Sequence, residues 1–201
     1  LLWNQFDIET ITRKGLIFEH MKKELEKQNA FPMPELPKLE GPGGITIDMQ
    51  ISLQDLAEGQ VILDTRDEEG RGMLVETGAY GSIKLTLSNG DESSTWSSDR
   101  GLIEAFGTHQ VTAVIHSGPR IISFVVNGIV CDGREYRPFG WGRYDKEITD
   151  INGGPLRTGI QKKGSKRLKH LRIYNRNLMH TEVIGNQRAG EGYHPSLLLR
   201  D

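Results

Sequence analysis

The sequence predicts an all-β fold, an antiparallel jelly-roll β-sandwich with an N-terminal helix and a Pro-rich connector in front of it. The stretch from Ile45 to Leu53 alternates apolar and polar residues without interruption, which is typical of a strand with one buried face. Short apolar runs then recur between turn residues, and residues 110–127 form a hairpin pattern around Ser117-Gly118-Pro119. The 24 glycines and 8 prolines among 201 residues supply the turns that such a meander of strands requires.

The N-terminal helix is expected over residues 15–29. Ile17, Met21 and Leu25 lie four residues apart, with charged residues between them, and this is the apolar stripe of an amphipathic helix. The charges on its polar face are mixed in sign, which favours a helix docked on the protein over a helix that lies on a membrane.

A connector is expected between this helix and the sandwich. Residues 31–44 contain four prolines and three glycines, which exclude a helix or a central strand and favour an extended backbone. We therefore divide the chain into residues 1–43, the helix and linker, and residues 44–201, the sandwich with a short C-terminal tail.

Within the sandwich, further strands are expected where apolar residues alternate between turn signals. Asn127-Gly128 predicts a tight turn, and residues 91–100 are polar and are expected to form a loop. A short helical turn is expected at residues 182–184. The expected strands cover residues 61–63, 72–76, 82–87, 110–117, 120–127 and 167–174.

The composition excludes several classes of protein. The single cysteine, Cys131, rules out an internal disulfide and any zinc site with more than one thiolate. A net charge of -2 argues against nucleic acid as a partner, and the chain has no apolar run long enough to form a membrane-spanning helix. The chain begins at Leu1 without a signal pattern, and we interpret it as an excised or processed piece of a longer protein.

Two segments resemble the laminin-G-like, pentraxin-like and concanavalin A-like family of sandwiches. Arg172-Ile173-Tyr174-Asn175-Arg176-Asn177-Leu178 is similar to the closing strand of these domains. The segment from Gly107 to Gly128 is similar to the family's hairpin, with His109 at one of its His positions, although Thr108 stands where a Trp is usual. The resemblance implies a sandwich that recognises a partner, sugar above all, in a secreted, periplasmic or cell-surface protein. Both segments belong to the structural framework of such domains, so they indicate the fold and not the ligand-binding site.

The long segment from Cys131 to Gly154 is the expected binding loop. Aromatic side chains can stack on sugar rings, and arginines can hold a carboxylate or sulfate, so the carbohydrate ligand could be anionic. Alternatively, the loop folds over the sandwich and buries its aromatic residues as a small additional core. The candidate ligand-binding residues are Trp96, Arg134, Tyr136, Arg137, Trp141, Arg143 and Tyr144.

The resemblance also implies a Ca²⁺ ion near one end of the sandwich, because many domains of this family bind it there through carboxylates and carbonyl groups. Hard oxygen ligands at turns suit this ion, although the alternative is an ordinary solvated turn. The candidate ligands are Asp64, Asp67 and Glu69 in one turn, and Asp150 and Asn152 in another.

A basic stretch runs from Arg157 to Arg176 and contains no acidic residue. It could attract a polyanion such as a sulfated glycan. A solvated hairpin tip at residues 162–166 is the favoured interpretation, because strand alternation would divide these side chains between two faces.

The chain contains no catalytic motif that we recognise. The related glucanases carry Glu-x-Asp-x-Glu along one strand, and no Glu-x-Asp occurs here; Gly-x-Ser-x-Gly is also absent. The sequence therefore predicts a non-catalytic carbohydrate-recognition module of a larger secreted or envelope protein, such as a polysaccharide-degrading enzyme. Two alternatives stay open: an architectural spacer packed on a neighbouring glycoside hydrolase or sulfatase domain, and a protein-binding module.

Overall fold

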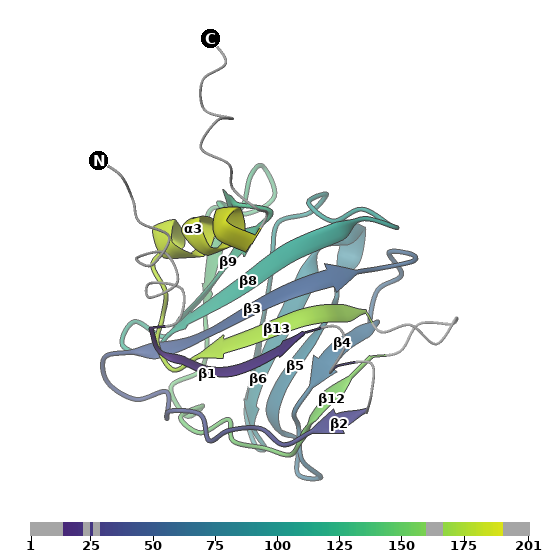
Figure 1. Cartoon of the computed structure of the whole chain (residues 1–201). Helices are drawn as coiled ribbons and strands as arrows, with labels where there is room; N and C mark the ends of the chain where they lie inside the picture. The colour runs from purple at the N-terminus through teal and green to yellow at the C-terminus, as the bar shows by residue number, and fades with distance from the viewer. Residues whose placement is uncertain (1–13, 22–24, 26–28, 160–166, 191–201) are drawn as a thin grey trace, which may run out of the picture.

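The computed structural model of the chain, shown in Figure 1, describes residues 14–21, 25, 29–159 and 167–190. Two antiparallel sheets lie face to face, which confirms the predicted β-sandwich. The first sheet contains, in spatial order, β1 (Leu16–Met21), β13 (Leu168–Tyr174), β3 (Gly44–Ser52), β8 (Thr108–His116), β9 (Ile121–Val126) and β10 (Ile129–Val130), and β11 (Trp141–Arg143) also pairs with β9. The second contains β2 (Ala30–Phe31), β12 (Leu156–Thr158), β4 (Val61–Asp64), β5 (Arg71–Thr77), β6 (Ile83–Asn89) and β7 (Ser93–Ser97).

The core lies between the sheets and follows from the alternation in the sequence. Ile45, Ile47, Met49 and Ile51 on β3 are fully buried, as are the inward residues of β6 on the opposite sheet. Each large apolar side chain that is buried in this way contributes roughly 1.5–3 kcal/mol. The strands are therefore held in register by their inward faces, since a shift of one residue would expose the whole set.

A helix, α3 (His180–Gly190), covers part of the outer face of the first sheet (Figure 1). Beneath it, Val114, Val125 and Tyr174 pack with Leu178 and Val183 in a second apolar cluster. This helix is longer than the short turn that the sequence predicted. Among the residues described, no helix is both long enough and apolar enough to cross a membrane.

The predicted N-terminal helix is wrong over residues 16–21, which form the edge strand β1. Glu19 lies opposite Arg172 in the antiparallel pairing with β13, and the two side chains form an ion pair of 2.9 Å. Glu19 also contacts His170 at 3.1 Å. These long-range partners override the helical spacing of the apolar residues, which is only a weak local preference. Residues 22–24 and 26–28 of the predicted helix lie outside the described part of the chain.

The Pro-rich segment has no helix or strand between residues 32 and 43, as predicted, but it packs tightly on the sandwich. Leu36 and Leu39 are buried, three residues apart, which matches an extended polyproline backbone with about three residues per turn. The Leu36 N–H donates to Asn152 Oδ1 at 2.7 Å, and the Leu39 N–H donates to the Thr149 carbonyl at 2.7 Å. With β1 and β2 included, the sheets thus begin well before residue 44.

The loop predicted at residues 91–100 is wrong over its central part, which forms the edge strand β7. Thr86 and Thr95 face each other across β6 and β7 and share a hydroxyl hydrogen bond of 2.7 Å. An edge strand with polar side chains shows no alternation of apolar residues, so the sequence periodicity does not reveal that it pairs with β6. The predicted basic tip at residues 162–166 and the tail at residues 191–201 lie outside the described residues.

Candidate ligand-binding site

Several loops meet at one end of the sandwich, which we call the loop end: residues 53–60, 78–82, 98–107 and 127–140. Backbone hydrogen bonds join them, including Gly101 N–H to the Tyr80 carbonyl at 2.8 Å and Phe106 N–H to the Leu53 carbonyl at 2.7 Å. Of the large apolar side chains that are exposed in the described part of the chain, all but Met179 belong to these loops. The loop end is therefore the most exposed apolar surface of the described molecule, a feature that marks interaction sites.

A pocket of about 470 Å³ opens at the loop end, which we call the tyrosine–arginine pocket. It is lined by Tyr80, Arg100, Gly101, Arg134 and Tyr136. The guanidinium carbon of Arg100 lies 4.8 Å from the ring centroid of Tyr80 and 4.8 Å from that of Tyr136. Cation–π contacts of this kind are worth roughly 0.5–1 kcal/mol each at exposed sites and fix the orientation of the guanidinium plane.

Two residues of this pocket have a backbone that L-amino acids rarely adopt. Tyr80 has a φ of 54° and Arg134 a φ of 46°, both in the left-handed region. Each such residue costs roughly 1–2 kcal/mol compared with an ordinary backbone. Strained non-glycine residues concentrate at functional sites, where the surrounding structure holds them in place. Phe106, Arg120 and Asn127 adopt the same conformation elsewhere in the described chain, so the strain describes these two pocket residues but does not by itself identify the pocket as functional.

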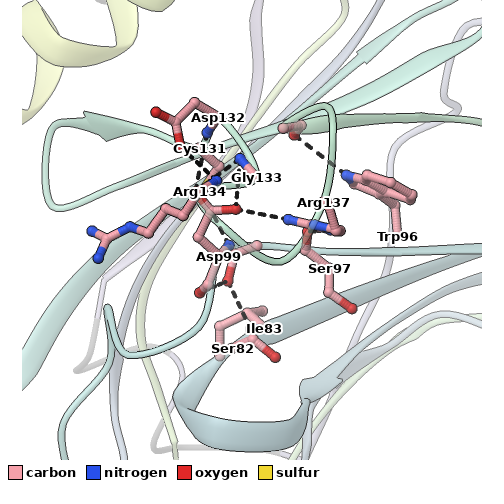
Figure 2. Close-up of polar contacts among 12 residues, drawn as sticks. Ser82, Ile83, Trp96, Ser97, Asp99, Cys131, Asp132, Gly133, Arg134 and Arg137 are labelled. Carbon is pink, nitrogen blue, oxygen red and sulfur yellow. Dashed lines mark hydrogen bonds and ion pairs between the residues drawn. The ribbon is translucent and has the colours of Figure 1, made fainter.

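The buried side chain of Asp99 holds two of these loops together (Figure 2). Its carboxylate is 2% exposed and accepts hydrogen bonds from the Asp132 N–H at 3.0 Å and the Gly133 N–H at 3.1 Å. Arg137 Nη2 donates to the same carboxylate at 2.7 Å. Because Asp99 immediately precedes Arg100, this cluster fixes the position of Arg100 relative to the loop that carries Arg134.

Cys131 belongs to the same cluster and has a structural role. The Asp99 N–H points at its sulfur, 3.3 Å away. Burial raises the pKa of the Cys131 thiol to about 11, so it stays protonated at neutral pH.

Two of the predicted ligand-binding residues, Trp96 and Arg137, are engaged with each other. The Arg137 guanidinium carbon lies 4.5 Å from the centroid of the Trp96 ring, and its Nη1 donates to the Ser97 carbonyl at 2.9 Å. Trp96 Nε1 donates to the Gly140 carbonyl at 3.4 Å. A Cβ at Gly142 would lie only 2.1 Å from Trp96 Cε3, so the indole rests directly on the backbone of β11. These contacts match the alternative in which the loop folds over the sandwich.

The other predicted residues divide into three groups. Tyr144 is buried in the core, and this burial raises the pKa of its hydroxyl. Trp141 and Arg143 lie on β11, where Trp141 stacks on Phe139 with ring centroids 5.0 Å apart. Only Arg134 and Tyr136 line the tyrosine–arginine pocket.

Tyr80 and Arg100 were missed by the sequence analysis. The only signal for Tyr80 is a large aromatic residue in a tight Gly-Ala-Tyr-Gly turn, where small or polar residues are usual. Arg100 follows β7 in a stretch that was interpreted as a polar loop, and nothing local distinguishes it from a solvated arginine.

The carboxylates of the first predicted calcium turn already have partners. Asp64 is partly buried, which raises its pKa, but hydrogen bonds from Arg66 outweigh this and lower it. Arg157 lies 3.4 Å from the same carboxylate. Asp67 accepts the backbone N–H groups of Glu69 and Arg71 at 3.1 and 2.9 Å, as in an ordinary turn.

The second predicted calcium turn is occupied in the same way. Asp150 accepts the Asn152 backbone and side-chain N–H groups, both at 2.9 Å, and Asn152 pairs with Leu36. In the described part of the chain, no three His, Cys, Asp or Glu residues are close enough to share a metal ion. Both turns use these oxygen atoms in hydrogen bonds or ion pairs of their own, and calcium remains a prediction.

A second pocket, of about 430 Å³, lies between the Pro-rich segment and residues 151–155. Its lining is mainly proline, glycine and apolar side chains, with Glu35 as the one charged residue. Its polar side chains are Glu35, Thr65 and Asn152, and the last two already form hydrogen bonds within the protein, so fewer polar groups are available to a ligand than in the tyrosine–arginine pocket.

Comparison with known proteins gave structural matches alone. No family model and no curated protein matches this chain. The CBM40 domain of the Ruminococcus gnavus IT-sialidase, solved bound to alpha2,3 sialyllactose, matches with a TM-score of 0.55 and 10% identity, over 85% of this chain and 97% of that one. This match shows that the two chains share the β-sandwich fold.

Two longer proteins contain the same sandwich. A leech intramolecular trans-sialidase, complexed with 2,7-anhydro-Neu5Ac, matches with a TM-score of 0.53 and 13% identity, over 87% of this chain but 28% of its own. The binding domain of botulinum neurotoxin serotype D matches with a TM-score of 0.56 and 10% identity, over 73% of this chain and 37% of its own. The chain thus spans about a third of these two proteins, and identities this low speak to the fold alone.

Proposed function

We propose that this chain is a non-catalytic carbohydrate-recognition module that binds its ligand in the tyrosine–arginine pocket. The observation that supports this most directly is the lining of that pocket, where exposed tyrosine rings lie beside arginine side chains. Aromatic rings offer faces to the C–H groups of sugars, and guanidinium groups donate hydrogen bonds to their oxygen atoms. The structural match to a domain solved with sialyllactose is consistent with this assignment.

The pocket lacks the groups needed for hydrolysis. Glycosidases typically place two carboxylates about 5–10 Å apart on either side of the bond that they cleave. None of the five residues that line the pocket is acidic. Of the acids nearby, Asp99 is buried and paired with Arg137, Asp132 accepts the Arg134 backbone N–H, and Glu135 interacts with the Tyr136 hydroxyl. The pocket therefore suits binding without chemistry.

We further propose that the module belongs to a larger secreted, periplasmic or cell-surface protein, such as a polysaccharide-degrading enzyme. The same sandwich forms only part of the leech trans-sialidase and of the neurotoxin binding domain. The narrower assignment to laminin-G-like domains rests on the two sequence segments and remains part of this proposal. A neighbouring domain of the same polypeptide is the expected second partner.

The test is a glycan array probed with the whole chain, followed by calorimetry on the best ligand. Tyr136 and Phe139 provide a matched pair, since both side chains are 54% exposed and only Tyr136 lines the pocket. Tyr136→Ala should weaken binding at least tenfold, whereas Phe139→Ala should change it less than twofold. An array without any hit, or equal effects of the two variants, would contradict the proposal.

A second candidate function is docking on a neighbouring domain. The observation in its favour is the set of exposed aliphatic and aromatic side chains at the loop end outside the pocket: Leu56, Phe106, Ile129 and Val130. Exposed apolar side chains that gather in one patch commonly mark protein interfaces. In the full-length protein, Phe106→Asp should then separate the module from its neighbour in limited proteolysis while glycan binding persists.

A further inference from the structure

Arg100 and Arg134, the two arginines of the pocket, form no ion pair with a carboxylate among the residues that the structure describes. Arg137, in the same loop as Arg134, is paired with Asp99 at 2.7 Å. We propose that Arg100 and Arg134 together hold an anionic group of the ligand, a carboxylate or a sulfate, in the tyrosine–arginine pocket. This inference rests on the carbohydrate recognition proposed above and specifies the chemical class of the ligand.

The acidic residues closest in sequence are already engaged. Asp132 accepts the backbone N–H of Arg134 at 2.9 Å, and its own N–H is held by Asp99. The Glu135 carboxylate interacts with the Tyr136 hydroxyl and raises the pKa of that tyrosine. The loop thus contains acids but uses each of them for its own conformation. Neither guanidinium group at the pocket forms an ion pair with these carboxylates, so the N–H donors of both remain available to a ligand.

The orientation of Arg100 decides how a ligand can reach it. Tyr80 and Tyr136 both contact the guanidinium through their ring faces, at 4.8 Å from each centroid. The N–H donors of a guanidinium lie in its plane, so they remain available to a planar or tetrahedral oxyanion that approaches the edge. Such a fork binds carboxylate and sulfate with two parallel hydrogen bonds. The Tyr80 and Tyr136 rings are thus partly occupied by Arg100. We therefore expect the negative charge of the ligand to be the main feature that the pocket recognises.

Arg134 reaches the same pocket from a loop whose backbone is fixed. Its φ of 46° follows directly on Gly133, where a Cβ would lie 2.6 Å from the Arg137 carbonyl oxygen. Figure 2 shows the Arg134 side chain extending away from the Asp99 cluster, with no interaction drawn to its guanidinium. A preorganised backbone lowers the entropy lost on binding, which favours a long side chain as a ligand-binding group.

The test uses an array of glycans in matched sets, in which one core carries a carboxylate, a sulfate or a neutral group at the same position. Binding should be confined to acidic members and should weaken as salt rises from about 0.05 to 0.5 M, since screening shortens the Debye length below about 10 Å. Arg100→Gln and Arg134→Gln should each reduce affinity for the acidic ligand at least tenfold. Arg143→Gln is the control. Arg143 is also an exposed arginine, but it lies on β11 and does not line the pocket.

The outcomes separate this inference from the function on which it rests. Equal binding of neutral and acidic members, still abolished by Tyr136→Ala, would overturn the anionic ligand and leave carbohydrate recognition intact. Retention of acidic ligands by both Arg→Gln variants, with melting temperatures unchanged, would also overturn it. The absence of any bound glycan would overturn both proposals. A preference between the carboxylate and sulfate sets would identify which oxyanion the pocket accepts.

Discussion

Replacing Asp99 by Asn should destabilise the fold far more than a substitution of one side-chain atom suggests. In the native protein, Oδ1 accepts from the Gly133 N–H and from Arg137 Nη2, and Oδ2 accepts from the Asp132 N–H. A carboxamide replaces one of these acceptors by a donor, so at least one buried N–H loses its partner and faces another N–H group. Arg137 simultaneously loses its ion pair.

The magnitude follows from these contacts. A hydrogen bond to a charged group is worth roughly 1.5–3 kcal/mol, and breaking a buried ion pair costs about 3–5 kcal/mol. Because Arg137 keeps some contact with solvent and retains Trp96 and Ser97, we expect a loss near the lower end, about 3 kcal/mol in the free energy of unfolding. For a chain of this length, that corresponds to a fall of about 6–12 °C in melting temperature.

Urea denaturation followed by circular dichroism measures this loss directly. Asp132→Asn is the matched control, since its exposed carboxylate accepts only the Arg134 N–H in the same cluster, and its loss should cost about 1 kcal/mol or less. If the two variants proved equally stable, the Asp99 carboxylate would not be holding the loops together, and the argument about the positions of Arg100 and Arg134 would fail with it.

Three other predictions follow from the packing and the titratable groups. Gly142→Ala places a Cβ 2.1 Å from Trp96 and should cost about 1–3 kcal/mol in urea denaturation; an unchanged midpoint would show that the indole moves freely. Burial lowers the pKa of His180, so the unfolded chain takes up a proton that the folded chain resists, and stability should fall as pH drops below about 6.5. His180→Gln should flatten that part of a stability–pH profile, and an unaltered slope would exclude this histidine as the cause. A chain that starts at Gly44 lacks β1, β2 and several buried side chains of the Pro-rich segment, at roughly 1.5–3 kcal/mol each, and should show no cooperative thermal transition in calorimetry.

The strands with one buried face could be predicted from the sequence because their inward residues repeat every second position. β6 follows this pattern closely, whereas β3 is buried on both faces over much of its length, since Thr46 and Asp48 are buried as well as its apolar residues. The tight turn after β9 uses Asn127 with a φ of 50° and Gly128 with a φ of 75°, as its Asn-Gly sequence indicates. The edge strands β1 and β7 could not be predicted in this way. The partner of β1 is distant in the sequence, and the ion pair of Glu19 with Arg172 is revealed by no local pattern. β7 pairs with the adjacent β6, but its polar side chains show no apolar alternation.

The candidate site was predictable only in part, for a related reason. Composition identified a loop rich in aromatic residues and arginines, and two of its members, Arg134 and Tyr136, do line a pocket. Composition could not distinguish them from Trp96 and Arg137, which pack on each other. Composition also could not predict that Arg100 lines the same pocket. The position of Arg100 depends on the hydrogen bonds that the preceding residue, Asp99, accepts from a loop more than 30 residues away.

A buried carboxylate separates the structural arginine of this loop from the free ones. The loops at this end must satisfy the Asp132 and Gly133 N–H groups away from water, and an unsatisfied buried N–H costs roughly 1–3 kcal/mol. Asp99 meets that need, but a buried negative charge itself requires a cation, and Arg137 supplies it while resting on Trp96. One arginine is thus committed by the folding requirements of the loop. Arg100 and Arg134 have no such requirement to meet in the described structure: ring contacts hold the Arg100 guanidinium, and only the backbone of Arg134 is constrained. A guanidinium held by neutral rings keeps its N–H donors available, which is the arrangement that the proposed anionic ligand requires.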